Sequence, residues 1–245
     1  MLGRRYQTNP CTGRIGYFCK NSRGNRFKHF SRTYCCEKSQ LNHKEDKIKL
    51  SCILLAAGRS RRFGPPNKLL ENIGCKSILN LSCAVLGYFN FTEKVIVLGY
   101  ESEKMQHEIP QSFKTVLNPD YRTGMASSIK SGVAGLGSAW DGVLIYLADM
   151  PFIHKDSINL LIDNFIQAQG RKICVPIYNE QTGNPVIFPV KFKEKLMDLK
   201  GDTGARNMIR NCFNDAILVQ VDDKNILFDI DTKSNLQNFR GKEVQ

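Results

Sequence analysis

The chain has 245 residues, of which 42% are hydrophobic, and this length suits one α/β domain with a full core or at most two small domains. Its apolar runs are shorter than the roughly 20 residues that a membrane span needs, and no apolar segment typical of a secretion signal stands near the start. We therefore expect a cytoplasmic protein without a membrane partner.

Positive charge is concentrated at the start of the chain, whose net charge is +12. Residues 1–40 contain nine of the 35 Lys and Arg residues and a single acidic residue, Glu37. The remainder is only mildly basic. Such a surface suits an enzyme that binds polyanionic phosphates, and it requires no nucleic-acid partner to explain it.

Residues 1–45 show neither the apolar period of a strand nor that of a helix. We interpret them as a disordered basic extension, followed by one folded domain over residues 46–245. Three accounts of the extension stay open: a tail without a role, an Arg-rich organelle-targeting segment, or a stretch that is not translated because Leu41 serves as an alternative start.

From about Lys49 onward, apolar runs alternate with segments of helical spacing. In chain order we expect a strand at 51–56, a helix at 77–89, a strand at 94–98, a helix at 101–108, a strand at 114–117, a helix at 125–136, a strand at 142–147, a helix at 157–168, strands at 172–176 and 185–188, helices at 192–199 and 203–212, strands at 216–221 and 227–229, and a helix after Thr232. This alternation favours a Rossmann-like, doubly wound, mostly parallel sheet, with ligands bound beyond the carboxyl ends of its strands.

The segment from Leu55 to Lys68 (L-A-A-G-R-S-R-R-F-G-P-P-N-K) follows the first expected strand directly. Its small residues at 56–58 let backbone N–H groups approach a ligand, and successive N–H groups can form an anion-binding concavity. Arg62 and Lys68 add positive charge suited to a triphosphate. Neither the Walker pattern nor G-x-G-x-x-G is present, and the alternative is a plain solvated basic loop.

Carboxylates follow two distant strands of the expected fold. Asp149 ends a strongly apolar strand, where a buried charge needs a purpose such as binding Mg²⁺. Asp229 and Asp231 alternate, so on an extended segment they share one face, and either could complete the metal site. The alternatives are a turn-forming Asp149 before Pro151 and an Asp231 that caps the last helix.

Two weaker signals open helices. The segment from Asn118 to Ser128 runs from a turn into a helix, where N–H groups could face a ligand and Ser127 or Ser128 could reach a base or ribose. Before the helix expected at 203–212, Asp202 is either its N-cap or part of a site. Arg206 is either a surface charge or a clamp for an acceptor phosphate.

These motifs, in this order, resemble those of the MobA-like NTP transferases, and within that family the molybdenum cofactor cytidylyltransferase (MocA-like) branch. The matching motifs are L-A-A-G-x-S-x-R-x-G…K at 55–68, N-P…G-M-x-S-S-[IL] at 118–129, D-x-P at 149–151, G-N/H-P-V-x-F at 183–188, G-D-x-G-A-R at 201–206 and D-I-D-T at 229–232. The resemblance therefore covers about residues 50–240. It implies a single-domain fold of the nucleotide-diphospho-sugar transferase type.

The resemblance also implies an activity: transfer of CMP from CTP to the molybdopterin cofactor with release of pyrophosphate, and partnership with a xanthine-dehydrogenase-type molybdoenzyme. By the same likeness Ala56, Ala57 and Gly58 line the nucleotide, Arg62 and Lys68 hold its phosphates, and Asp149 and Asp231 hold Mg²⁺. The expected nucleotide site comprises Leu55, Ala56, Ala57, Gly58, Arg62, Lys68, Ser127, Ser128 and Asp149, of which Arg62, Lys68 and Asp149 are the catalytic set, and the expected acceptor side comprises Asn184, Asp202 and Arg206. Many family members have His where this chain has Asn184.

The residues suit in-line attack by an acceptor phosphate oxygen on the α-phosphorus of the nucleotide, because such transfers depend on positioning and charge neutralisation and need no protein nucleophile. Two alternatives are a nucleotidyltransferase that uses GTP or a sugar or alcohol phosphate, and a non-catalytic protein that binds and inserts the molybdenum cofactor.

Overall fold

One central sheet organises the described part of the folded domain. The computed structural model describes residues 17–20, 26–29, 48–60, 62–137, 139–202 and 204–240. The chain divides into two units, residues 1–46 and 47–245. In the first, β1 (Tyr17–Lys20) pairs antiparallel with β2 (Arg26–His29), two strands that we did not predict. The rest of residues 1–45 lies outside the described residues, so the disordered extension stays a prediction.

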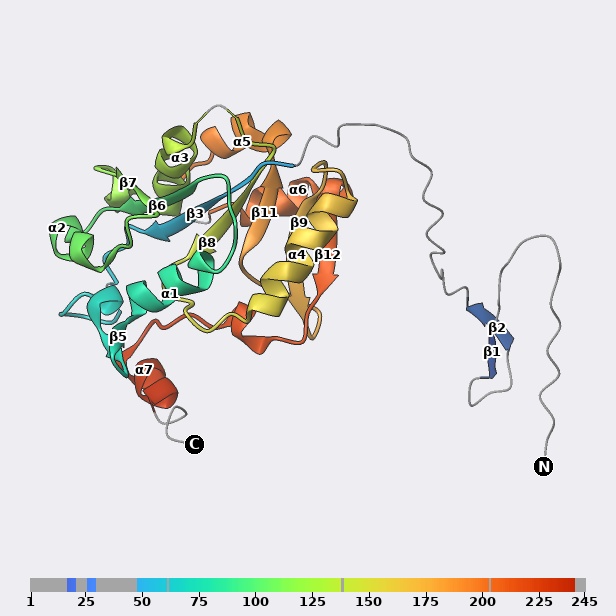
Figure 1. Cartoon of the computed structure of the whole chain (residues 1–245), viewed down its shortest axis with the longest axis horizontal. Coiled ribbons are helices and arrows are strands. Elements are labelled where there is room, and N and C mark those ends of the chain that lie inside the picture. The colour runs from blue at the N-terminus through green and yellow to red at the C-terminus, as the bar shows by residue number, and fades with distance from the viewer. Residues whose placement is uncertain are drawn as a thin grey trace. The chain divides into compact units, whose positions relative to one another are not determined.

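The sheet of the second unit is mostly parallel, as predicted (Figure 1). Its strands run in the order β10-β9-β11-β8-β3-β6-β7, and β12 also pairs with β9. The parallel group is β7 (Lys114–Leu117), β6 (Lys94–Leu98), β3 (Leu50–Ala56) and β8 (Gly142–Leu147). β11 (Val186–Pro189) is antiparallel to β8 and to β9 (Ile173–Tyr178), β10 (Gln181–Thr182) is antiparallel to β9, and β12 (Ala216–Gln220) is parallel to β9.

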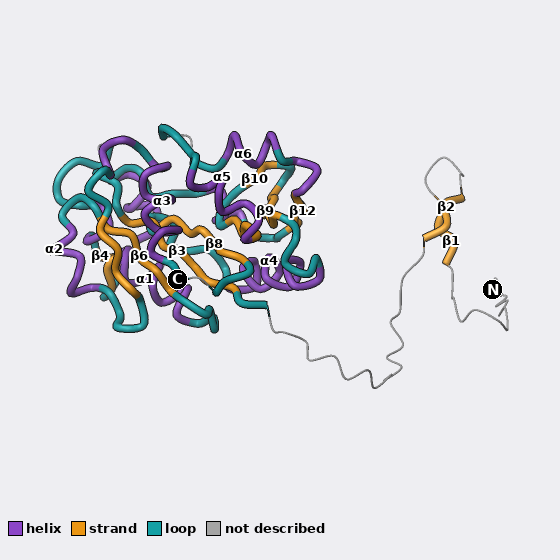
Figure 2. Tube along the Cα trace, turned by 90° about the horizontal axis from the view of Figure 1, so that it is seen from above, coloured by secondary structure: helices purple, strands orange, loops and turns teal. Residues whose placement is uncertain are grey.

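Helices cover both faces of the sheet because the side chains of β3 alternate between two apolar clusters. Cys52, Leu54 and Ala56 face the cluster that includes α1 (Ile78–Gly87) and α4 (Lys155–Gln167). Ile53 and Leu55, on the other face of β3, belong to the second cluster, which includes residues of α3 (Met125–Gly135), α5 (Lys193–Met197) and α6 (Arg206–Asn211). Figure 2 shows these two helical layers on either side of the strands. In the part of the chain that the structure describes, no helix is both long and apolar enough to cross a membrane.

The order of the strands places a switch point between β3 and β8. The chain runs outward from β3 through β6 to β7 and then returns to β8, on the other side of β3. The loops that follow β3 and β8 therefore diverge from neighbouring strand ends, and Ala148 N–H still donates to the Leu55 carbonyl at 3.1 Å. Ligands bind at such a point in doubly wound sheets.

The remaining elements differ from the prediction at a few places. A strand was expected at 227–229, and this was wrong: residues 224–227 form a 3₁₀ turn, η6 (Lys224–Leu227), because the Asp223 carboxylate accepts from Asn225 N–H at 3.0 Å. The helix expected at 101–108 is α2 (Ser102–Met105) followed by the 3₁₀ turn η2 (Gln106–Glu108). Unpredicted β4 (Asn72–Ile73) and β5 (Lys76–Ser77) form a short hairpin, and α7 (Lys233–Arg240) follows Thr232 as expected.

The packing of α3 on β3 gives a test of the fold. Helix propensity alone predicts that changing a helical glycine to alanine stabilises by about 1 kcal/mol. At Gly132 of α3, however, a Cβ would stand 2.6 Å from Ile53 Cγ2. We expect Gly132→Ala to lower the free energy of unfolding by about 1–3 kcal/mol, measured by urea denaturation, because overpacking outweighs propensity.

Gly87→Ala is the matched control, since Gly87 ends α1 and an added Cβ there meets no atom within 4 Å. It should not destabilise the protein. Equal effects of the two substitutions would contradict the close approach of α3 to β3.

Candidate active site

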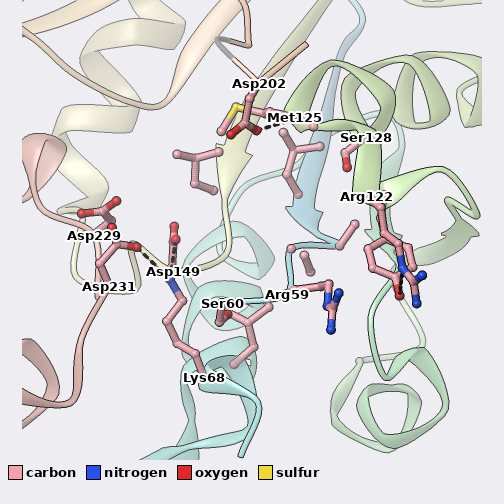
Figure 3. A pocket seen from close by; sticks show the side chains of 18 of the residues that line it. Arg59, Ser60, Lys68, Arg122, Met125, Ser128, Asp149, Asp202, Asp229 and Asp231 are labelled. Atoms are coloured by element: carbon pink, nitrogen blue, oxygen red, sulfur yellow. Dashed lines mark hydrogen bonds and ion pairs between the residues drawn. The ribbon is translucent and has the colours of Figure 1, made fainter. Parts of the chain in front are cut away.

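A cavity of about 660 Å³ lies at the switch point between β3 and β8. It collects many residues of the predicted site from distant parts of the sequence, and Figure 3 shows most of their side chains. The predicted residues that line it are Leu55, Ala56, Ala57, Gly58, Arg62, Lys68, Ser128, Asp149, Asp202 and Asp231.

Lys68 occupies the centre of the acidic side of this cavity. It begins the 3₁₀ turn η1 (Lys68–Leu70), which is fixed by Leu69 N–H donating to the Asn67 side chain at 3.1 Å. Its Nζ lies 2.9 Å from Asp149 Oδ2 and 3.3 Å from Asp231 Oδ1, and the residue is only 5% exposed. A buried ammonium needs such partners, because desolvation would otherwise make the charge costly.

The segment that carries Asp229 and Asp231 is tied to the end of β8. Ile230 N–H donates to the Asp149 carbonyl at 3.0 Å, so the two aspartates of this segment flank a backbone link to Asp149. Carboxylate oxygens of Asp149, Asp229 and Asp231 lie within 4.8 Å of one another. The sequence argument left open which of Asp229 and Asp231 completes the site with Asp149, and the structure places both carboxylates beside it.

The electrostatics of this cluster suit a cation. Asp229 is exposed as a residue, yet partial burial of its carboxyl, followed by the nearby Asp231 and Asp149 charges, raises its pKa. Mg²⁺ and similar hard divalent ions prefer oxygen ligands of this kind. The three carboxylates therefore fit a divalent metal. They offer oxygen ligands, and their negative charge exceeds the single positive charge of Lys68, which contacts two of them.

The N-terminus of α3 is closed by a loop from later in the sequence. Met125 N–H donates to Asp202 Oδ1 at 3.1 Å, and Ala126 N–H donates to the Gly201 carbonyl at 3.1 Å. We expected these N–H groups to face a ligand and Asp202 either to cap its own helix or to bind the acceptor. The structure shows that Asp202 caps α3, where Gly124 (φ +115°) allows the close approach of Gly201. Its role toward an acceptor stays a prediction.

Three predicted residues do not line this cavity. The Ser127 hydroxyl donates to the carbonyls of Gly124 and Asp120 at 2.8 and 3.0 Å, so it closes the first turn of α3. Asn184 precedes β11 and its N–H donates to the Ile226 carbonyl at 3.0 Å, and Arg206 is exposed at the start of α6.

The cavity also contains a cationic and aromatic side that the sequence reasoning missed. The Arg59 guanidinium lies 5.4 Å from the Tyr100 ring centroid, and that of Arg122 lies 5.7 Å from the Tyr121 ring centroid. Arg59, Tyr121 and Arg122 line the cavity, and Figure 3 shows both arginines away from the aspartates. Arg59 lies within the 55–68 motif and Arg122 within the 118–128 turn. Their positions inside these two motifs could have indicated from the sequence that both belong to the site.

A doubly wound sheet with a basic loop facing three carboxylates across one cavity at its switch point has the arrangement of a nucleotidyltransferase-type α/β protein. Residues 52–217 match the model of the MobA-like NTP transferase domain, and the chain belongs to that family. The prediction of the family from its motifs is thereby confirmed, as is the predicted fold.

Relatives and solved structures agree with this assignment. The purine catabolism protein PucB of Bacillus subtilis (strain 168) is 29% identical over 190 residues, which cover 74% of this chain and 90% of PucB. A probable molybdenum cofactor guanylyltransferase of Methanosarcina mazei is 25% identical over 190 residues, or 73% of this chain and 81% of that protein.

Among solved structures, an Rv0371c homologue from Mycobacterium sp. strain JC1 has a TM-score of 0.72 at 25% identity and covers 80% of this chain and 97% of its own. Rv0371c of Mycobacterium tuberculosis H37Rv in complex with manganese has a TM-score of 0.65 at 19% identity. The match covers 79% of this chain and 99% of the Rv0371c chain.

The capping contact of Asp202 predicts a local loss of stability when it is removed. We expect Asp202→Ala to lower the free energy of unfolding by about 0.5–2 kcal/mol, the usual cost of losing a helix N-cap, and to speed hydrogen exchange at Met125 N–H. Asp198→Ala removes an exposed aspartate at the end of α5 and should change neither quantity. Unchanged exchange at Met125 in the Asp202 variant would show that the contact does not protect this amide.

Proposed function

We propose that this chain transfers CMP from CTP to the phosphate of a molybdopterin-type cofactor and releases pyrophosphate. The observation that carries the proposal is the cavity in which the loop after β3 faces three carboxylates from the ends of two distant segments. Such a cavity offers both the positive charge that a triphosphate needs and the donor set that its metal needs.

The loop residues would bind the nucleotide. Backbone groups at Ala56, Ala57 and Gly58 border the cavity directly beyond β3, where small side chains leave room for the nucleotide. Arg62 would contact phosphate oxygens through its fork of N–H groups, and Lys68 would act as a fixed point charge at the acidic side. The two alanines in this loop are what we expect of the cytidylyl branch, and they support CTP.

The carboxylates would hold Mg²⁺, with Asp149 and Asp231 as its ligands and Asp229 beside them. A bound divalent ion supplies Lewis-acid neutralisation of phosphate charge. The chain's own residues supply the rest. They hold the α-phosphorus in line between the acceptor oxygen and the departing pyrophosphate oxygen, and they donate to the oxygens that gain charge.

A second candidate nucleotide is GTP, because two relatives from Methanosarcina carry the name probable molybdenum cofactor guanylyltransferase. The acceptor could also be a sugar or alcohol phosphate. A xanthine-dehydrogenase-type enzyme would be the recipient of the cytosine dinucleotide form of the cofactor.

A pyrophosphate-release assay with Mg²⁺, molybdopterin cofactor and each of the four common NTPs tests the proposal. We expect the fastest release with CTP and none when the acceptor is omitted. Faster release with GTP would transfer the assignment to the guanylyl reaction. Cofactor binding without release from any NTP would favour a binding and insertion protein instead.

Asp149→Ala tests the role of the acidic cluster. Removal of one preorganised charge contact typically lowers a rate by a factor of about 10²–10³, so we expect turnover to fall at least a hundredfold in a metal-replete assay. The circular dichroism spectrum should stay unchanged. Asp163→Ala, at an exposed position on α4, is the control for the loss of an aspartate, and near-normal turnover of the Asp149 variant would refute the role.

A further inference from the structure

Asp231 is the aspartate of the cluster whose two carboxylate oxygens both contact a cation. Its Oδ1 lies 3.3 Å from Lys68 Nζ, and its Oδ2 lies 2.7 Å from Arg62 Nη1. The contact of Lys68 with Asp149 goes through a single oxygen, Oδ2. A metal ion that approaches the cluster therefore meets, at Asp231, a carboxylate whose oxygens are already engaged.

The two cations on Asp231 differ in how firmly they are held. The Lys68 side chain is 6% exposed and is shared with Asp149, so its departure would leave a desolvated charge and two carboxylates without their partner. The Arg62 side chain is 80% exposed and lines the cavity. It can leave Asp231 while it stays hydrated, and exposed ion pairs of this kind are weak.

We propose that the Arg62–Asp231 ion pair restrains metal binding in the nucleotide-free protein and is exchanged for an Arg62–phosphate contact when the nucleotide binds. The inference rests on the proposed function and adds the order in which nucleotide and metal bind. Before the nucleotide arrives, Arg62 occupies Asp231 Oδ2 and adds a positive charge beside the metal position. A polyphosphate gives the guanidinium better acceptors, because phosphate oxygens can bind its fork through two N–H groups.

The exchange makes nucleotide and metal bind cooperatively. Movement of Arg62 onto phosphate frees one oxygen of Asp231 at the moment when the phosphates themselves need a divalent ion. By linkage, the factor by which nucleotide tightens metal binding equals the factor by which metal tightens nucleotide binding. The ion pair thus keeps the affinity of the site for metal low until the nucleotide is bound.

The test measures Mn²⁺ alone on the full chain without nucleotide, by the electron paramagnetic resonance signal of free Mn²⁺. We expect Arg62→Gln to bind Mn²⁺ about three to ten times more tightly than the wild type, an effect of the size that one neighbouring charge exerts in a solvated site. The readout is independent of turnover.

Arg59→Gln is the matched control. Arg59 belongs to the same loop, is exposed and lines the same cavity, but its guanidinium lies over Tyr100. The substitution removes an equal charge, and we expect it to change Mn²⁺ affinity less than about twofold, since Figure 3 shows Arg59 away from the aspartates. Equal Mn²⁺ affinity of the Arg62 and Arg59 variants, including an absence of binding in both, overturns the proposal.

A second arm localises the effect to Asp231. In the Asp231→Asn background the anchoring carboxylate is gone, so adding Arg62→Gln should raise Mn²⁺ affinity no more than adding Arg59→Gln does. A full three- to tenfold gain in that background would show that Arg62 acts by general repulsion and would overturn the ion-pair mechanism. Failure of the proposed function has a different signature, namely no pyrophosphate release by the wild type with any NTP.

Discussion

The arrangement of this site depends on one buried ammonium. Lys68 contacts Asp149, 81 positions later, and Asp231, 163 positions later, while almost none of its side chain reaches solvent. A charge in that position needs a carboxylate partner, because an unpaired buried ion costs several kcal/mol. The loop after β3, the end of β8 and the segment before α7 are therefore held together by the same interaction, and the cavity exists because they meet.

The charges around Lys68 leave the acidic side of the cavity one positive charge short. When all three aspartates are ionised, Lys68 and Arg62 compensate for two of them. The opposite side, with Arg59 and Arg122 over tyrosine rings, is positive. A magnesium–triphosphate complex has the complementary polarity, since its metal is cationic and its free phosphate oxygens are anionic. The separation of charge within one cavity is what makes it suited to such a ligand and poorly suited to a neutral one.

The sequence predicted those features that depend on local pattern. The strand 94–98 and the strand 142–147 have the predicted bounds, because a short apolar run bounded by polar or turn residues suffices to define a buried parallel strand. The residues of the loop after β3 were found for the same reason, since a motif that follows a strand end must lie at the carboxyl edge of the sheet.

Features that depend on contacts between distant segments could not be predicted in this way. Asp202 precedes a helix, and the sequence left open whether it caps that helix or belongs to the acceptor site; its contact with α3 was not predicted, because only the fold brings it to Met125. The strand expected at 227–229 failed because the Asp223 side chain bonds the backbone and turns the chain at η6. Tyr100 has no motif around it, and its place beside Arg59 follows from the packing of β6 next to β3.

If the chain performs the proposed transfer, the occupied N-terminus of α3 would limit where an acceptor can approach. In-line transfer requires the acceptor oxygen and the departing pyrophosphate on opposite sides of the α-phosphorus. If Arg62 and Lys68 hold the pyrophosphate side, the acceptor must enter from the side bordered by Met125 and Asp202, which Figure 3 shows across the cavity from Lys68. The Asp202 carboxylate there already accepts a hydrogen bond from the backbone. Under the proposed reaction, an acceptor that entered on this side would meet a loop whose position is set by the helix it caps, so the contact that stabilises α3 would also shape the entrance for the second substrate.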